Sequence, residues 1–517
     1  MSTQHKDVYL VIGGSGFVGR HIVEQLVARG DVVSVFDIVQ RHHDVPFYSG
    51  DITDEQDVLN AIRRSGTTCI IHTASPQHGA KDPSIYYKVN VDGTQAVINA
   101  AVAAGVRKLV YTSSAGVVFD GKDVVHLDER APYPEKPFDA YNDSKAKGEA
   151  LILEANGKGG LLTVALRPAG IFGPGDRQMM VGLYQVYQRG QTHFQVGGNN
   201  NLFDYTYVGN IAQAHLLAAE KLVDSTTSDS TSITSASTDA TLVDSSLRAS
   251  LHRSLPPIAA TAGFRRVPTS MARPLGPYVT PPANAADIEG AFNAPFDPTK
   301  LTHAIVRNRF DQFSENALAV APTSPLQVAG QAFFITNGEP VYFWDFMRMI
   351  WLALDPPTEE GRKRAQRTPW VIPKAFGMVL GYLAETWAGL IGKEAGFTRY
   401  RVGYSCAMRY HNIEKARRVL GYEPEVGLEE GVRRMVEVGL ARVYVCVGQI
   451  LTTYWFLVVQ GGERSCIDAR GFIFVRVMGH RTLESYSYLI DSTYIYLLHS
   501  FLSCRISGPV WDRLRYQ

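Results

Sequence analysis

The sequence predicts an α/β fold of the Rossmann type, a doubly wound parallel sheet that carries a smaller, discontinuous substrate domain. Two observations predict it. Residues 8–37 contain an apolar run, three glycines at three-residue spacing, a helical stretch and a second apolar run that ends on an acid. Further short apolar runs then end in small or polar residues, which is typical of strands whose carboxyl ends form a ligand crevice.

The glycine-rich stretch 8–37 is typical of a dinucleotide-binding βαβ unit. Gly13 permits the tight turn, Gly16 lets a pyrophosphate approach the backbone, and Gly19 lets the following helix pack closely on the strand. The start of that helix, at Phe17, offers N–H groups and a positive dipole end to the phosphates. A glycine-rich turn that binds nothing is the alternative, but the strand–helix–strand–acid context favours cofactor binding.

Asp37 ends the second apolar run, 18 residues after Gly19. A carboxylate at this position can accept hydrogen bonds from both ribose hydroxyls, whereas it would repel a 2′-phosphate. The predicted cofactor is therefore NAD, with NADP disfavoured.

Three later positions also point to the cofactor. Asp51 and Ile52 could hold and cover the adenine, although Asp51 could equally cap the helix that begins near residue 54. Ala74 follows the buried run 69–72, at a strand end where a ligand fits. His72, inside that run, is interpreted as a packed strand residue and not as a catalyst.

Ser114, Tyr141 and Lys145 form the predicted catalytic set. Tyr141 and Lys145 are four residues apart, so they share one face of a helix. The ammonium of Lys145 can then lower the pKa of the Tyr141 phenol from about 10, which would make it a general base. Ser114, which follows the strand 108–112, could orient the same substrate oxygen. A solvated helix face is the alternative reading of the tyrosine–lysine pair.

Pro168 ends another predicted strand, 162–166, and the sequence after it predicts a mobile loop that could close over the nicotinamide. Lys and Arg number 51 and Asp and Glu number 50, so nothing indicates a nucleic-acid partner. The five cysteines show no paired spacing, so neither a metal site nor a disulfide framework is predicted. The first strand starts too early for a signal peptide, which favours a cytosol-facing location.

The chain divides into four parts by composition. Residues 1–222 carry the nucleotide and catalytic motifs, and 223–325 form a Ser-, Thr- and Pro-rich insertion that is predicted to be disordered. Residues 326–442 form the substrate domain, in which the apolar segment 370–392 predicts an interfacial helix or hairpin, with a buried core helix as the alternative. The tail 443–517 has no Lys and seven tyrosines, so it is either a membrane anchor or sequence foreign to the rest.

The motifs GGSGFVG, YTSSAGVVF, YNDSK, LRPAGIFGPGD and YTYVGNIAQAH together resemble the extended short-chain dehydrogenases/reductases, in the 3β-hydroxysteroid dehydrogenase branch. Residues 331–351, QAFFITNGEPVYFWDFMRMIW, are most similar to sterol-4α-carboxylate 3-dehydrogenases of the decarboxylating type. The resemblance covers about residues 7–222 and 326–442. Within it, Ser114, Tyr141 and Lys145 match catalytic positions, and Gly13, Gly16, Gly19, Asp37, Asp51, Ile52 and Pro168 match cofactor positions.

The resemblance implies NAD-dependent oxidation of the 3β-hydroxyl of a 4α-carboxysterol, followed by loss of CO₂. It also implies a sterol substrate, the cytosolic face of the endoplasmic reticulum membrane, and contact with a sterol C-4 demethylation complex; a homodimer is compatible with it. If the hydrophobic segments were core, the location would be cytoplasmic. The alternatives are another enzyme of this fold (a 3β-hydroxysteroid dehydrogenase/isomerase, a dihydroflavonol-type reductase or a nucleotide-sugar epimerase), a non-catalytic NAD sensor, or an inactive copy.

Overall fold

The computed structural model describes residues 6–80, 82–223, 327–355, 359, 369–392, 395–413 and 415–439. The chain divides into two units, Met1–Gly439 and Leu440–Gln517, and all described residues belong to the first. The predicted tail, 443–517, lies outside the described residues, as does the predicted insertion apart from its first residue, 223.

A seven-stranded sheet, parallel throughout, forms the centre of this unit. Its strand order is β12-β7-β5-β4-β1-β2-β3. The strands are β1 (Val8–Ile12), β2 (Val32–Asp37), β3 (Phe47–Ser49), β4 (Cys69–His72), β5 (Lys108–Thr112), β7 (Leu162–Pro168) and β12 (Gln331–Ile335). Most strand residues are apolar and buried, as expected when helices cover both faces of a parallel sheet. The predicted Rossmann-type architecture is confirmed.

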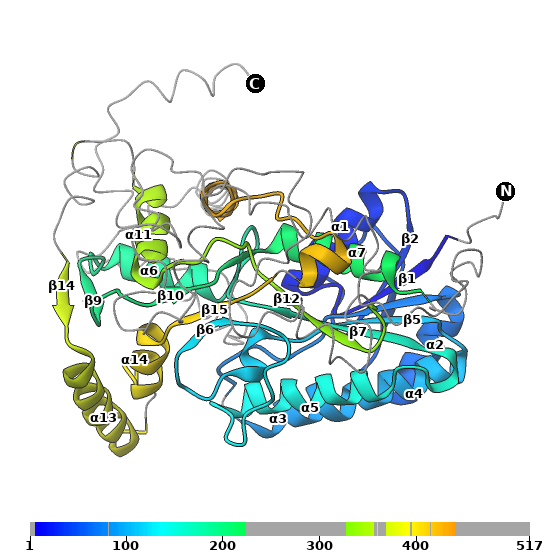
Figure 1. Cartoon of the computed structure of the whole chain (residues 1–517), viewed down its shortest axis with the longest axis horizontal. Coiled ribbons are helices and arrows are strands. Elements are labelled where there is room, and N and C mark those ends of the chain that lie inside the picture. The colour runs from blue at the N-terminus through cyan, green and yellow to red at the C-terminus, as the bar shows by residue number, and fades with distance from the viewer. Residues whose placement is uncertain are drawn as a thin grey trace, which may run out of the picture. The chain divides into compact units, whose positions relative to one another are not determined.

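Helices cover the two faces of the sheet in two layers (Figure 1). Successive strand side chains point to opposite faces, so Tyr9 and Val11 of β1 join one hydrophobic cluster while Leu10 and Ile12 join the other. The first cluster lies under α1 (Phe17–Ala28) and α7 (Val208–Lys221), and the second under α2 (Glu55–Ser65), α4 (Thr94–Ala104) and α5 (Ala140–Glu154). Shorter helical segments complete this half: α3 (Ser84–Tyr87), η1 (Lys88–Gly93), η2 (Ala115–Val118) and η3 (Lys158–Gly160).

The edge strand β12 comes from the segment that the sequence assigned to the substrate domain. It runs parallel to β7, with Phe333 opposite Leu166 and Ile335 opposite Pro168. Phe333, Phe334 and Ile335 are fully buried. The apolar run therefore extends the nucleotide-binding sheet, so the start of 326–442 belongs structurally to that sheet.

A smaller sheet, in the order β13-β10-β15-β6, lies on the substrate side. Its strands are β6 (Val124–Leu127), β10 (Leu202–Phe203), β13 (Val341–Tyr342) and β15 (Arg409–His411), which come from distant parts of the chain. The two-stranded pairs β8 (Ile171–Phe172) with β11 (Thr206–Tyr207) and β9 (Phe194–Val196) with β14 (Trp370–Ile372) accompany it, together with α6 (Met179–Gln188), α11 (Phe343–Leu354), α14 (Arg399–Cys406) and η4 (Ala416–Leu420). The substrate side is thus discontinuous, and its sheet also draws on the first half of the chain.

Helix α13 (Lys374–Leu390) lies at the periphery of the unit beside α14 (Figure 1). Gly377 and Gly381 face α14, where a Cβ on Gly381 would lie 2.7 Å from the Arg399 nitrogen. The opposite face is exposed and apolar, which excludes the alternative of a buried core helix. Within the described residues, no helix combines the length and the apolar character needed to cross a membrane.

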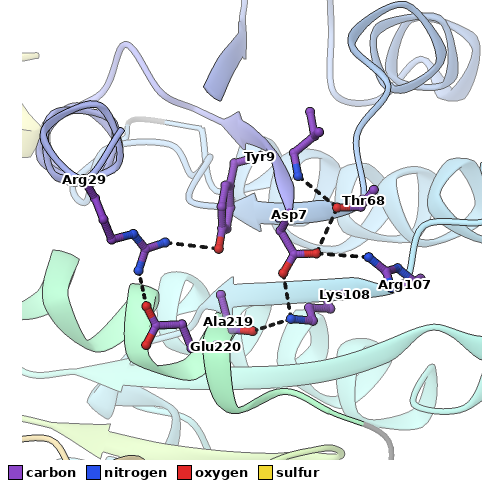
Figure 2. A network of polar contacts seen from close by, with 9 residues as sticks. Asp7, Tyr9, Arg29, Thr68, Arg107, Lys108, Ala219 and Glu220 are labelled. Atoms are coloured by element: carbon purple, nitrogen blue, oxygen red, sulfur yellow. Dashed lines mark hydrogen bonds and ion pairs between the residues drawn. The ribbon is translucent and has the colours of Figure 1, made fainter. Parts of the chain in front are cut away.

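A polar network ties the amino-terminal edge of the large sheet together (Figure 2). Asp7, just before β1, accepts hydrogen bonds from Thr68 Oγ1 (2.9 Å) and from Lys108 Nζ (2.7 Å). Lys108 Nζ also donates to the carbonyl of Ala219 in α7 (3.0 Å). These contacts fix β1, β4, β5 and α7 at one edge, which leaves the opposite, carboxyl edge for binding and catalysis.

Candidate active site

Five residues that were predicted to form the site follow or end strands of the large sheet at its carboxyl edge. Because the strands are parallel, their carboxyl ends meet at one edge. Gly13 follows β1, Asp37 ends β2, Ala74 follows β4, Ser114 follows β5 and Pro168 ends β7. The topology therefore brings together residues that lie far apart in the sequence.

The glycine turn leaves no room for side chains. Gly13 adopts φ 82°, and a Cβ on it would lie 2.7 Å from the nitrogen of Ala74. A Cβ on Gly19 would lie 2.3 Å from the Gly13 carbonyl, and one on Gly16 would lie 3.0 Å from the same oxygen. No side chain caps α1, whose first residue is Phe17. The turn thus has the close packing and the uncapped helix N-terminus that a bound pyrophosphate requires.

The loop after β8 reaches back to the first turns of α1. His21 Nε2 lies 2.8 Å from the Pro174 carbonyl, and Phe17 is the side chain nearest to a Cβ placed on Gly175 (3.9 Å). Pro168 itself is buried at the end of β7, paired with Ile335. The residues predicted to form a loop after Pro168 include β8, which pairs with β11. This part of the site is therefore held by strand pairing.

Asp37 lies beside the glycine turn. Its carboxylate accepts hydrogen bonds from the backbone nitrogens of Ser15 (3.0 Å) and Ile38 (2.8 Å). Arg41 Nη1 donates to the Ser15 carbonyl (3.2 Å), so a guanidinium lies at the same corner. The sequence analysis missed Arg41, because a single arginine in a loop gives no local signal.

Asp51 and Ile52 have separate roles in the structure. Asp51 accepts hydrogen bonds from the backbone nitrogen and hydroxyl of Thr53, both at 2.9 Å, which lowers its pKa even though burial opposes this. Asp54 caps α2 by accepting from Gln56 (2.8 Å), so the cap alternative for Asp51 is wrong. Ile52 is 7% exposed and packs against Gly93.

His72 is a packed strand residue, as predicted. It is fully buried, its Nε2 lies 3.2 Å from the Thr94 hydroxyl, and its ring contacts the Tyr111 ring. Burial lowers its pKa to about 3, with the Lys145 charge acting in the same direction. A neutral, enclosed imidazole of this kind does not serve as a base for a substrate.

Ser114, Tyr141 and Lys145 come together where α5 packs against η2. Ser114 is the N-terminal cap of η2 and its hydroxyl accepts from the Gly116 nitrogen (3.1 Å). A Cβ on Gly116 would lie 2.0 Å from Oδ1 of Asn142, the residue after Tyr141, so the two segments are in close contact. Lys145 is 2% exposed, and its Nζ donates to the Thr112 carbonyl (2.8 Å).

The pKa of Tyr141 differs from the expected lowered value. Burial raises it to about 12, and an interaction with the Ser75 hydroxyl only partly opposes this. Burial also lowers the pKa of Lys145 to about 7, against the field of Glu149. The reason is that Lys145 donates to the Thr112 carbonyl and lies over the Tyr111 ring (4.9 Å), while the rings of His78 and Tyr86 pack against Tyr141.

A buried ion pair connects the catalytic helix α5 to strand β7. Glu149, one turn after Lys145, accepts three hydrogen bonds from Arg167 of β7 at 2.5–3.1 Å and one from the Tyr133 hydroxyl at 2.6 Å. Glu149 is 0% exposed and Arg167 is 4% exposed. Although burial raises the pKa of Glu149, Arg167 lowers it below its usual range. No local pattern indicates this pair, because its members lie 18 residues apart on different elements.

A second polar cluster lies on the other side of Tyr141. His78 contacts the Tyr141 ring (5.2 Å between centroids), and its Nε2 lies 2.9 Å from the Tyr400 hydroxyl and 3.3 Å from Asp139. The Tyr400 hydroxyl also donates to Asp139 (3.0 Å). Asp139 caps α5 by accepting from Asn142 (2.7 Å). This cluster connects the catalytic helix to α14 on the substrate side, and sequence reasoning missed it.

The parallel sheet, the glycine turn and the serine, tyrosine and lysine define the class as a short-chain dehydrogenase/reductase. The 3-beta hydroxysteroid dehydrogenase/isomerase family model matches residues 10–236. Sterol-4-alpha-carboxylate 3-dehydrogenase ERG26, decarboxylating, from Saccharomyces cerevisiae is 36% identical over 442 residues, covering 83% of this chain and 96% of the relative. The decarboxylating sterol-4-alpha-carboxylate 3-dehydrogenase of Mus musculus is 31% identical over 430 residues, covering 83% and 89%.

The chain belongs to the family of decarboxylating sterol-4-alpha-carboxylate 3-dehydrogenases, within the 3-beta hydroxysteroid dehydrogenase/isomerase family, and it is an oxidoreductase. Among solved structures, the epimerase Mth375 from Methanothermobacter thermautotrophicus resembles the chain with a TM-score of 0.51 at 16% identity, covering 85% of this chain and 94% of the epimerase. At that identity the likeness concerns the fold alone.

Proposed function

We propose that this protein uses NAD to oxidise the 3β-hydroxyl of a 4α-carboxysterol, with loss of the carboxylate as CO₂. The observation that carries the proposal is the gathering of Ser114, Tyr141 and Lys145 at the same sheet edge as the glycine turn, in a chain of this family. NAD, when bound, accepts the hydride that leaves C3 of the sterol.

The residues of the site fit that cofactor. The turn at Gly13, Gly16 and Gly19 leaves the backbone open to a pyrophosphate, with Phe17 at the uncapped helix start. The carboxylate of Asp37 has lone pairs left for ribose hydroxyls after its two backbone hydrogen bonds. Asp51, Ile52 and Ala74 are the proposed adenine-side and turn contacts, and Pro168 lies on the nicotinamide side.

Tyr141 is the proposed general base and takes the proton of the 3β-hydroxyl, while Ser114 donates a hydrogen bond to the same oxygen. Lys145 is the proposed contact to the nicotinamide ribose. The product of hydride loss is a β-keto acid. The bond to the carboxylate can then break, because the adjacent ketone accepts the electron pair as an enolate, and a proton taken up at C4 completes the reaction.

The test is to incubate the purified protein with NAD and a 4α-carboxysterol, and to follow NADH and CO₂ together. Appearance of both at the same rate is the expected result. If only a simple 3β-hydroxysteroid is oxidised, the dehydrogenase chemistry stands and the carboxysterol substrate is wrong. NAD binding without turnover of either sterol would contradict the proposed activity and favour a sensor or an inactive copy.

The pH dependence of sterol oxidation should follow the Tyr141 phenol. A base acts when deprotonated, so a raised pKa means that kcat/KM rises with pH across the range 7–9, by up to about tenfold per pH unit. A profile that is flat over this range in the wild type would contradict the assignment of Tyr141.

Asp37→Ala should weaken NAD binding by about tenfold or more, since hydrogen bonds to a charged group contribute roughly 1.5–3 kcal/mol. NADP should bind better than in the wild type, because the carboxylate no longer repels the 2′-phosphate and Arg41 remains at the same corner. Titrations of both cofactors measure this, and Asp37→Ala/Arg41→Ala should lose the gain for NADP. An unchanged preference in Asp37→Ala would exclude Asp37 from the ribose site.

We also propose that α13 attaches the enzyme to a lipid surface, on the cytosolic face of the membrane that supplies the sterol. Its exposed face is a stripe at three- and four-residue spacing, formed by Phe376, Val379, Leu383, Trp387 and Leu390. Each is 55–76% exposed. Such a stripe, with a tryptophan near one end, matches a helix that lies in the membrane interface.

Leu383→Glu/Leu390→Glu should reduce binding to phosphatidylcholine vesicles by at least about tenfold, since each buried leucine contributes roughly 1.5–3 kcal/mol. Vesicle co-flotation measures the bound fraction. Val27→Glu, which changes an exposed valine on α1, is the matched control and should bind as the wild type does. Equal flotation of the double variant and the control would contradict the lipid-surface proposal.

A further inference from the structure

Arg409 is a half-buried cation on the substrate side that has no carboxylate partner among the described residues. It begins β15, and its guanidinium lies 4.1 Å from the ring centre of Phe119, 4.7 Å from that of Tyr404 and 5.3 Å from that of Phe203. Among the described residues, no acid forms an ion pair with it and its side chain has no hydrogen-bond partner. Aromatic faces attract a guanidinium but leave its N–H groups without acceptors.

A buried acid next to β15 is already hydrogen-bonded to another residue. Asp204, next to Phe203 and 1% exposed, accepts hydrogen bonds from the backbone nitrogen (2.7 Å) and Nδ1 (3.1 Å) of His411. The Arg409 charge acts on Asp204 only at longer range. The five N–H donors of the guanidinium therefore remain available to a ligand.

Aromatic contacts lead from Arg409 to the catalytic tyrosine. The Phe119 ring contacts Phe138 (4.7 Å between centroids), and Phe138 contacts Tyr400 (4.8 Å). Tyr400 belongs to the cluster with His78, whose ring meets Tyr141. Tyr404, which contacts Arg409, also stacks on Tyr400, with 6.2 Å between the ring centroids. A series of ring contacts thus connects Arg409 to the residues around Tyr141.

Other basic side chains of this region already have a hydrogen-bond acceptor or an acidic partner. Lys145 donates to the Thr112 carbonyl, Arg167 is paired with Glu149, and His78 lies beside Asp139. A sterol carboxylate that leaves water needs a charge-assisted partner, because burying an unpaired carboxylate is costly. Arg409 supplies the missing positive charge.

We propose that Arg409 recognises the carboxylate of an anionic sterol. The inference rests on the proposed function for its substrate class and goes beyond it by assigning the residue that distinguishes an acid from a neutral sterol. A charge-assisted hydrogen bond contributes roughly 1.5–3 kcal/mol, or about ten- to hundredfold in affinity. Loss of CO₂ removes the group that Arg409 holds, which would favour release of the ketone.

The test compares a 4α-carboxysterol with its methyl ester, which has nearly the same shape but no charge. Equilibrium binding with NAD present is measured in Tyr141→Phe, so that turnover does not interfere. Arg409→Gln in this background should lower the affinity for the acid by about ten- to hundredfold. The affinity for the ester should change by no more than about twofold. Arg409→Lys should recover part of the loss, because it keeps the charge without the bidentate fork. Arg401→Gln, an exposed arginine of α14, is the control that should change neither ligand.

Several outcomes would overturn the inference. Equal loss for acid and ester would show that Arg409 only supports the fold, and an unchanged affinity for the acid would show that another group reads the carboxylate. If Arg409→Gln does not fold, the Tyr141→Phe protein with Arg409 intact decides, because equal affinity for acid and ester there contradicts the inference. A different outcome would separate the two proposals. If binding of the acid depends on Arg409 but the otherwise wild-type protein does not oxidise it, the inference stands and the proposed function is overturned.

Discussion

Replacing Tyr141 with phenylalanine is expected to lower sterol oxidation by about 10²–10⁴-fold, the range that general-base catalysis contributes. The substitution removes only the hydroxyl, so the ring contacts with His78 and Tyr86 remain and the fold should not change. NAD binding should stay within about twofold, because the glycine turn and Asp37 lie on other elements. Steady-state kinetics and a cofactor titration on the same preparation measure both quantities.

A matched control is available one helix away. The Tyr87 hydroxyl donates to Asp143, a residue of the catalytic helix, at 2.7 Å. Tyr87→Phe removes the same atom near the same helix but away from the strand-end crevice, and its turnover should remain close to that of the wild type. Retained turnover in Tyr141→Phe, or equal losses in the two variants, would show that Tyr141 is not the base.

Arg167→Met is expected to lower the free energy of unfolding by about 3–5 kcal/mol, which is the range for breaking a buried ion pair by removing one partner. The variant leaves Glu149 fully buried, with the Tyr133 hydroxyl still donating to it at 2.6 Å. Urea denaturation of wild type and variant measures the difference. Because Glu149 lies one turn from Lys145, the variant should also lose activity if the catalytic helix shifts.

The pH dependence of the loss of stability identifies its cause. In the wild type, Arg167 holds the pKa of Glu149 below its usual range, whereas in the variant burial alone would raise it. The penalty should therefore be fully present at neutral pH and should shrink as the pH falls towards about 4, where the carboxyl is protonated in both states. A loss that does not change with pH would point to lost packing instead of an unpaired charge.

Two further variants test whether the unpaired charge of Glu149 causes the loss of stability. Arg167→Met/Glu149→Leu removes both charges and should recover much of the stability, because an apolar pair of similar volume can replace a buried ion pair. Arg433→Met breaks an exposed pair with Glu430 and should change stability little, since surface ion pairs contribute weakly. A double variant no more stable than Arg167→Met would mean that packing dominates at this position.

Local sequence patterns were sufficient to predict the α/β class, the glycine turn and the buried character of His72. These depend on local patterns: the period of apolar residues gives strands and helices, and glycine spacing gives the turn. Motif similarity likewise indicated the family before any geometry was known. Local pattern also placed Tyr141 and Lys145 on one face of α5, because a four-residue spacing fixes that relation.

The environment of these residues could be seen only in the folded protein. Three features of the site depend on contacts between distant elements. They are the hydrogen bond from Lys145 to the Thr112 carbonyl, the raised pKa of Tyr141 and the ion pair of Glu149 with Arg167. The addition of β12 to the large sheet and the exposure of the apolar face of α13 depend on which neighbours cover them. Periodicity along a chain predicts which face is apolar, but burial and electrostatic environment arise from residues that meet only after folding.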